Sequence, residues 1–148
     1  MAKKRNRPPV RTGGVNPALQ SLHVRARFPG FVAKSLAAGG AIWEGTLQPR
    51  DSSPVYHIVI SHSVDGIPKV HVTSPKILPN PHLYSDGSLC LYWPKQWSWR
   101  KDRLLAKTII PWTALWLHFY ELWLDTGEWL GPSSHQQPKV QETKPSAA

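Results

Sequence analysis

The stretch VYHIVISHSVDGIPKVHVTSP, residues 55–75, contains two runs of alternating apolar side chains on either side of a turn. The first run, 55–63, is rich in β-branched and aromatic residues, and the second, 69–75, alternates Val70 and Val72 with polar neighbours. The dipeptide Asp65-Gly66 between them is typical of a tight turn. The stretch therefore predicts two antiparallel strands.

A third strand is predicted directly upstream, over residues 41–49. In AIWEGTLQP, Ile42 and Glu44 alternate with Trp43 and Leu47, as in a strand with one buried face. The polar residues 51–53, followed by a proline at position 54, supply the turn to the next strand. Three short strands joined by tight turns predict an antiparallel meander, and a sheet of three to four strands is expected.

A helix is predicted before the meander. Asn16 followed by Pro17 is typical of a helix N-terminus, because Asn caps the first turn and Pro suits the first helical position. Leu19, Leu22 and Ala26 then mark one apolar face.

A second helix is predicted to start at Pro111 and to stop at Gly127. Leu117, Tyr120 and Leu124 add apolar side chains to the opposite face, so we expect a helix that is buried on most sides. The alternative is that its far face meets a partner. The main face carries six apolar side chains at helical spacing: Trp112, Leu115, Trp116, Phe119, Leu122 and Trp123.

These elements predict an α+β fold in one domain over residues 16–130. Apolar residues make up 41 % of the chain and include eight Trp, which is enough for a packed core. We expect residues 1–15 to be a flexible basic arm and residues 131–148 a disordered tail. Without an apolar run of membrane-spanning length or an apolar signal segment, the expected location is cytoplasmic, with no membrane partner.

Cys90 is the only cysteine, and it lies between an Asp-Gly-Ser turn and an aromatic run. Pro75, Pro79 and Pro81 upstream exclude regular helix and disfavour a central strand. Because such a coil can hold a reactive group outward on a rigid scaffold, we expect a partly exposed thiol. Its replacement by Ala or Ser should then change the unfolding free energy by no more than about 1 kcal/mol. The alternative is a small buried core residue.

Two chemistries use a single thiol nucleophile. In papain-like hydrolases the Cys usually opens a helix and a His acts as base, whereas LCLYWP, residues 89–94, runs into a proline. An acyl carrier takes an acyl group from a thioester and passes it to an amine, which requires access and a donor for the oxyanion. Asn80 and His82 offer an amide and an imidazole close upstream, so the acyl carrier fits better.

No cofactor and no metal are expected. The sequence lacks a glycine-rich phosphate loop, and one cysteine cannot build a Cys-based zinc cluster. His57, His62 and His71 have no Asp, Glu or Cys beside them at ligand spacing, so exposed strand histidines explain them more simply.

The order of the elements and the cysteine motif resemble the ubiquitin-conjugating (UBC-like) enzymes. That family has His-Pro-Asn, a short spacer, Gly-Ser-Ile-Cys-Leu and then Trp-Ser or Trp-Thr. This chain has Asn80-Pro81-His82, Gly-Ser-Leu-Cys-Leu over 87–91, and Trp97-Ser98. The resemblance is sharp over residues 68–98 and looser over 17–126. It implies a UBC-like fold and a thioester between Cys90 and the C-terminus of a protein acyl donor, with ATP-dependent activation left to a separate enzyme.

The chain departs from the family pattern in its triplet, which is inverted. With the spacing fixed on Cys90, the family's Asn falls on His82 and its His on Asn80; a loop two residues longer would keep Asn80 as the oxyanion donor. Both therefore stay catalytic candidates beside Cys90, and the alternative for each is structural, with Asn80 capping a turn and His82 packing beneath the coil. Only one strong helix follows the cysteine, so a shortened C-terminus is expected.

A shortened, aromatic-rich version resembles the bacterial members of the family that are encoded with nucleotide-second-messenger synthases in antiphage (CBASS) operons. That resemblance implies that the acyl donor is the C-terminus of a cGAS-like nucleotidyltransferase. Tyr84, Trp93 and Trp97 flank Cys90 and are the expected partner contacts.

Two other functions stay open. An inactive relative would use the same fold to hold a partner, which the inverted triplet favours and the intact cysteine motif disfavours. A nucleic-acid-binding protein would stack bases on exposed Trp93, Trp97 and Trp99 beside basic side chains, and the net charge of +9 permits this. Nucleic acid is the weaker alternative.

Overall fold

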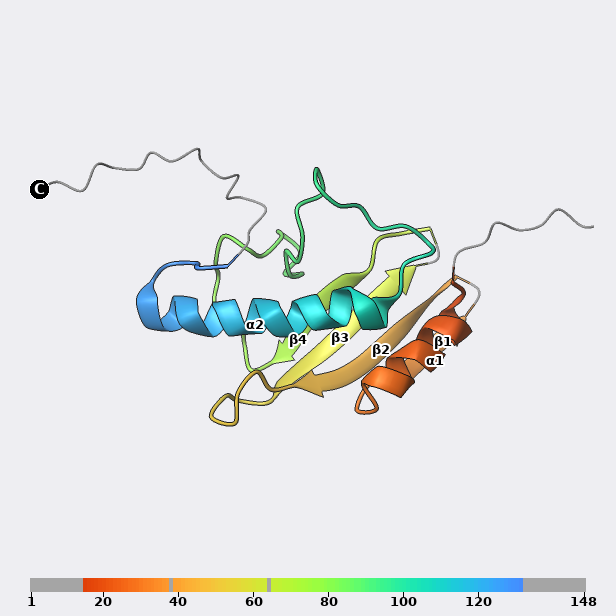
Figure 1. Cartoon of the computed structure of the whole chain (residues 1–148), viewed down its shortest axis with the longest axis horizontal. Coiled ribbons are helices and arrows are strands. Elements are labelled where there is room, and N and C mark those ends of the chain that lie inside the picture. Colours follow the sequence, from red (N-terminus) through yellow and green to blue (C-terminus); the bar gives the residue numbers. More distant parts are fainter. Residues whose placement is uncertain (1–14, 38, 64, 132–148) are drawn as a thin grey trace, which may run out of the picture.

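The computed structural model describes residues 15–37, 39–63 and 65–131 of the chain (Figure 1). An N-terminal helix, an antiparallel sheet and a C-terminal helix confirm the predicted α+β fold. The predicted arm, 1–15, and tail, 131–148, lie almost wholly outside the described residues. The elements in chain order are α1 (Pro17–Arg27), β1 (Val32–Ala37), β2 (Gly40–Leu47), β3 (Tyr56–Ser63), β4 (Lys69–Ser74), the short 3-10 helix η1 (Leu105–Lys107) and α2 (Ile109–Thr126).

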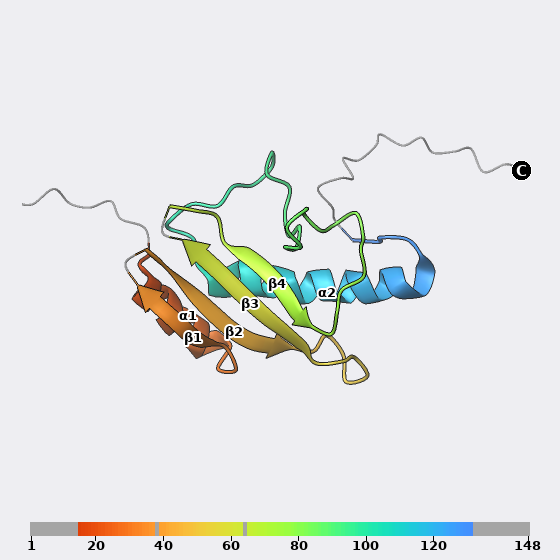
Figure 2. The ribbon, with the colours of Figure 1, turned by 180° about the vertical axis from the view of Figure 1, so that it is seen from behind.

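The four strands form one antiparallel sheet in which the spatial order β1-β2-β3-β4 follows the chain. Seen from behind in Figure 2, the sheet lies in front of both helices, so α1 and α2 cover the same face. The three predicted strands are confirmed as β2, β3 and β4. The additional edge strand, β1, has the sequence VAKSLA, whose single β-branched residue gave no strand signal.

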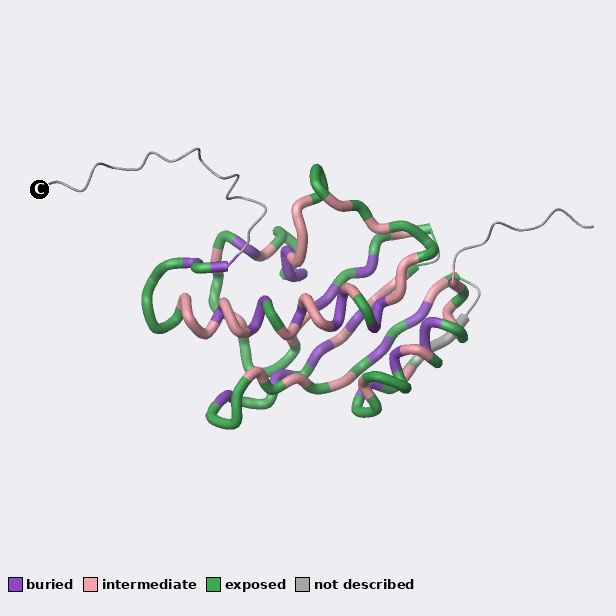
Figure 3. Tube along the Cα trace, viewed as in Figure 1, coloured by how far each residue is buried: buried purple, intermediate pink, exposed green. Residues whose placement is uncertain are grey.

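The core lies between the sheet and the helices, where the buried residues of Figure 3 concentrate. Trp43 on β2 is fully buried, whereas Ile42 and Glu44 beside it are exposed, as the alternation predicted. The other large, fully buried apolar side chains are Phe31 just before β1, Ile58 and Ile60 on β3, Val70 on β4, Val24 on α1, Leu105 on η1, and Ile109, Ile110 and Leu117 on α2.

Helix α1 begins as predicted, since the Asn16 side chain accepts a hydrogen bond from the Leu19 N–H at 2.8 Å. Its predicted apolar face, however, is not the face that packs on the protein. Leu19 is 42 % exposed and Leu22 is 62 % exposed.

A polar residue takes the core-facing position of α1 in place of these leucines. Gln20 is 1 % exposed; its Nε2 donates to the Arg103 carbonyl at 2.7 Å and its Oε1 accepts from the Leu105 N–H at 3.1 Å. A buried amide that is satisfied at both ends carries no desolvation penalty of the kind that excludes polar residues from a core. Gln20 thereby ties α1 to η1, and through it to the start of α2.

Helix α2 begins at Ile109, just before the predicted Pro111, and ends as predicted at Gly127, whose left-handed backbone donates to the Trp123 carbonyl at 2.8 Å. The sequence predicted burial on most sides of this helix; in the structure the stripe through Leu117 and Tyr120 meets the sheet, whereas Leu115 on the opposite stripe is exposed. Both sides of the helix are apolar, so periodicity alone does not decide between them. The buried residues of α2 are Ile109, Ile110, Thr113, Trp116, Leu117 and Tyr120.

Residues 75–104 form the coil that the prolines predicted, and it is tied to both layers of the fold. The Leu78 N–H donates to the Tyr120 hydroxyl of α2 at 2.9 Å. The Leu89 N–H donates to the Val70 carbonyl of β4 at 2.9 Å. The cysteine segment is therefore held against the edge strand of the sheet.

Within the coil, residues 82–90 fold back as a small hairpin around the predicted Asp-Gly-Ser turn. The Tyr84 N–H donates to the Ser88 carbonyl, and the Gly87 N–H donates to the Tyr84 carbonyl, each at 2.9 Å. Gly87 has φ +82°, which favours glycine at this position. The Asp86 carboxylate accepts from the Ser88 N–H at 2.9 Å and from Lys69 Nζ of β4 at 2.7 Å.

The assignment of the core face of α2 predicts unequal effects of two leucine substitutions. Leu117→Ala should lower the free energy of unfolding by about 2–5 kcal/mol, because it leaves a cavity in the core. Leu115→Ala, at a position that is 48 % exposed, should cost no more than about 1 kcal/mol. Urea unfolding followed by circular dichroism measures both. Equal losses, or a larger loss for Leu115→Ala, would contradict the assignment of the core face to the stripe through Leu117.

The turn at Asp86 predicts a pH-dependent contribution to stability. The Lys69 ammonium and the Ser88 donors hold the pKa of Asp86 well below its usual range. Because the pKa is lower in the folded state, the contribution is complete above the unfolded pKa of about 4 and is lost as the pH falls below it. The free energy of unfolding of Asp86→Asn should therefore be lower than that of wild type at pH 7, and this difference should be smaller at pH 3. An equal difference in unfolding free energy at pH 7 and at pH 3 would show that Asp86 acts through the shape of its side chain alone.

Candidate functional site

Cys90 lies on the second arm of the hairpin and is buried. Its N–H donates to the His82 carbonyl at 2.9 Å, and its Sγ donates to the Tyr92 carbonyl at 3.9 Å. The residue is 6 % exposed, so the expectation of an outward, partly exposed thiol was wrong. The bond from Leu89 to β4 draws this arm inward and buries Ser88 and Leu89 together with the cysteine.

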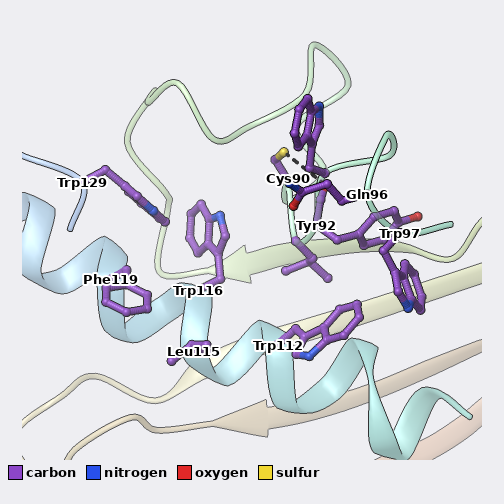
Figure 4. A pocket seen from close by; sticks show the side chains of 11 residues that line it. Cys90, Tyr92, Gln96, Trp97, Trp112, Leu115, Trp116, Phe119 and Trp129 are labelled. Atoms are coloured by element: carbon purple, nitrogen blue, oxygen red, sulfur yellow. Dashed lines mark hydrogen bonds between the residues drawn. The ribbon is translucent and has the colours of Figure 1, made fainter. Parts of the chain in front are cut away.

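The cysteine borders a cavity of about 300 Å³ between the hairpin and α2 (Figure 4). Cys90 lies on the coil side, and side chains of α2 line the opposite side. A ligand that fills this cavity therefore lies against Cys90. The lining residues are Cys90, Leu91, Tyr92, Trp93, Gln96, Trp97, Trp112, Leu115, Trp116, Phe119 and Trp129.

A second cavity, of about 590 Å³, lies between the hairpin, the start of β4 and residues 94–99. Its lining includes Lys69, Tyr84 and Asp86 but not Cys90. Burial, followed by a hydrogen bond with the Cys90 thiol, raises the pKa of Tyr84 above its usual range. Tyr84 therefore both lines the second cavity and interacts with the Cys90 thiol.

His82 is brought next to Cys90 through the backbone of the hairpin. The residue is 3 % exposed, and its ring packs on the indole of Trp129 with 4.1 Å between centroids and 32° between planes. This is the packed position that the sequence analysis gave as its structural alternative. A catalytic role for the imidazole stays a prediction.

Asn80 uses both ends of its side-chain amide within the coil. Its Nδ2 donates to the Leu78 carbonyl and its Oδ1 accepts from the His82 N–H, each at 2.9 Å. These bonds are the turn-capping arrangement that the sequence analysis left open. As an oxyanion donor, Asn80 would have to use its second amide hydrogen, and that role also stays a prediction.

The tryptophans after the cysteine pack on other side chains of the protein. Trp97 lies between Tyr92 and Trp112, with ring centroids at 4.6 and 4.7 Å, and the Arg103 guanidinium lies 4.5 Å from its centroid. Trp99 packs edge-on against His62 at 5.2 Å. The nucleic-acid interpretation required Trp93, Trp97 and Trp99 to be exposed for stacking, and these contacts already use the rings of Trp97 and Trp99.

The predicted partner contacts each line at least one of the two cavities. Trp93 lines the cavity at Cys90, Tyr84 lines the second cavity, and Trp97 lines both. The three residues therefore surround the cysteine segment, and contact with a partner stays a prediction for each.

The described part of the chain holds no group of three or more His, Cys, Asp or Glu side chains that could bind a metal ion. Within the same residues, none of the helices combines the length and the apolar character needed to cross a membrane.

Trp129 is a site residue that the sequence analysis missed. It is 8 % exposed, stacks on His82, and lies 5.2 Å from Trp116 between ring centroids. The available signal was an aromatic residue just after the Gly127 stop. The stripe of α2 through Trp112 and Leu115 was recognised as apolar, but nothing in its spacing indicated that it lines a cavity at Cys90.

The sequence of the chain matches a known protein family. No curated protein matches the chain. A sequence model of the family described as Type II CBASS E2 protein matches residues 20–136, a span that contains the sheet, the cysteine hairpin and α2. The match covers most of the chain and agrees with the UBC-like resemblance of the cysteine motif. The chain therefore belongs to the Type II CBASS E2 family, the UBC-like E2 proteins of CBASS antiphage defence.

Proposed function

We propose that the protein is a cysteine acyltransferase that carries a protein C-terminus as a thioester on Cys90. The observation that carries this proposal is that the one cysteine of a chain in an E2 family lies in the wall of a cavity. A cysteine that served packing alone would not require open space beside it.

In the first step, the Cys90 thiolate attacks the carbonyl carbon of an activated thioester at the donor's C-terminus. The new S–C bond forms, the old S–C bond breaks, and the donor's previous thiol leaves as a thiolate. The exchange is nearly isoenergetic, since one thioester replaces another. The Tyr84 hydroxyl, hydrogen-bonded to the Cys90 thiol, supports this step by stabilising the negative charge on sulfur.

In the second step, an amine attacks the thioester carbonyl, an amide forms, and Cys90 leaves as a thiolate that takes up the proton released by the amine. The tetrahedral intermediate requires a hydrogen-bond donor for its oxyanion. Asn80 and His82 are the proposed donors: His82 lies in the arm of the hairpin that pairs with the Cys90 arm, and Asn80 accepts from the His82 N–H just before that arm.

The acyl donor that we propose is the C-terminus of a cGAS-like nucleotidyltransferase, activated by a separate enzyme. Membership of the CBASS E2 family supports a protein partner from such a system. Partner contacts at Tyr84, Trp93 and Trp97 would place the donor and the acceptor around the cysteine segment.

Intact-mass measurement of the protein co-expressed with the candidate nucleotidyltransferase and activating enzyme tests the proposal. Wild type should carry an adduct of the donor's mass that thiol reductant and hydroxylamine both remove. Cys90→Ser should carry an ester that resists the reductant, and Cys90→Ala should carry none. Urea unfolding of both variants serves as the control for folding.

An adduct that persists on Cys90→Ala would contradict the assignment of Cys90. No adduct on wild type or on Cys90→Ser, with all three proteins folded, would favour the inactive, partner-holding relative. Asn80→Ala and His82→Ala then separate the oxyanion candidates, because loss of the true donor should slow transfer to an amine while the thiol is still acylated.

A further inference from the structure

The cavity at Cys90 is apolar and lacks charge. Among the described residues no charged side chain lines it, and α2 contributes Trp112, Leu115, Trp116 and Phe119. A volume of about 300 Å³ is twice that of an engineered protein cavity of about 150 Å³ that holds benzene. The space is therefore sufficient for one or two bulky side chains of a ligand.

The apolar lining continues onto the surface of the protein. Leu115 lines the cavity and is 48 % exposed, although it lies on a helix whose opposite stripe already supplies the core. An exposed apolar surface that runs into a cavity is typical of a binding site.

Two side chains that line this space also carry a buried indole N–H without a partner. The indole N–H groups of Trp116 and Trp129 have no hydrogen-bond acceptor among the described residues, and these residues are only 4 % and 8 % exposed. Trp43 shares this lack of an acceptor but lies in the closed core, whereas Trp116 and Trp129 line the cavity. In Figure 4 the indole nitrogen of Trp116 lies on the edge of the ring nearer Cys90.

We propose that this cavity selects acyl donors whose residues just before the C-terminal carboxyl group carry bulky apolar side chains. The inference rests on the proposed thioester at Cys90. Because Cys90 forms part of the cavity wall, an acyl chain on its sulfur lies in or across the cavity. Successive residues extend by about 3.3–3.6 Å each, so the two positions before the last residue lie within reach of the apolar walls.

The two cavities differ in polarity, and we assign the acyl donor to the first and the acceptor to the second. The apolar side chains of the donor tail pack on Leu115, Phe119 and Trp112. A charged side chain would lose its water there without gaining a partner. The second cavity, with Lys69 and Asp86 in its lining, suits a polar acceptor that approaches from the Tyr84 side.

Synthetic peptide thioesters test the selection without a partner protein. The probes are acetyl-Gly-Leu-Leu-Gly, acetyl-Gly-Ser-Ser-Gly and acetyl-Gly-Asp-Asp-Gly, each as the thioester of mercaptoethanesulfonate. Transfer to Cys90 forms one S–C bond, breaks another and releases mercaptoethanesulfonate, and intact mass follows its rate. The rate constant should be at least about 10-fold higher for the Leu-Leu peptide than for the Ser-Ser and Asp-Asp peptides, as expected when an apolar pocket discriminates by a few methylene groups.

A matched pair of α2 variants connects the preference to the cavity. Leu115→Asp should abolish most of the preference for the Leu-Leu peptide. Leu124→Asp is the control, because Leu124 is 47 % exposed on the same helix but does not line the cavity.

The outcomes distinguish this inference from the proposed function. Equal rates for the three peptides at Cys90, or equal effects of Leu115→Asp and Leu124→Asp, overturn the apolar selection and leave the thioester chemistry intact. No transfer from any peptide, in folded protein whose Cys90 reacts with iodoacetamide, overturns both.

Discussion

The hydrogen bond from the Leu89 N–H to the Val70 carbonyl joins the cysteine segment to the edge of the sheet. Strand β4 has a strand neighbour on one side only, and its other edge would otherwise expose unpaired backbone groups. The hairpin that carries Cys90 covers part of that edge. The position of the thiol is thereby set by the sheet, and the Lys69–Asp86 ion pair adds a second tie between the same two segments.

Placement against the edge strand reduces access to Cys90, because it draws the cysteine inward until only 6 % of the residue is exposed. A thiol that must meet a protein C-terminus requires an approach, and the cavity between the hairpin and α2 supplies one. The aromatic side chains that surround this approach exclude water, which strengthens hydrogen bonds to a developing charge. A buried thiol beside an open cavity is therefore compatible with acyl transfer, although it differs from the exposed thiol that the sequence suggested.

The architecture could be predicted from the sequence because the signals were local: alternation over three strands, turn residues at Asp65-Gly66, the Asn16 cap and the Gly127 stop. The orientation of the helices could not. On α1, Gln20 displaces two leucines from the core because its amide is satisfied by distant backbone groups that no local pattern reveals. The cysteine motif located Cys90, whereas Trp129 contacts His82 across a long stretch of chain and left no periodic signal.

The two apolar stripes of α2 have different roles. The stripe through Leu117 and Tyr120 builds the core, and the stripe through Leu115 and Phe119 lines the cavity at Cys90. Trp116 belongs to both, since it is buried and also lines the cavity, so its truncation would disturb stability and binding together. A helix that is apolar on two sides is unusual in a globular fold unless both sides are covered. In this protein the sheet covers one side, and the other borders the cavity where we place the acyl donor.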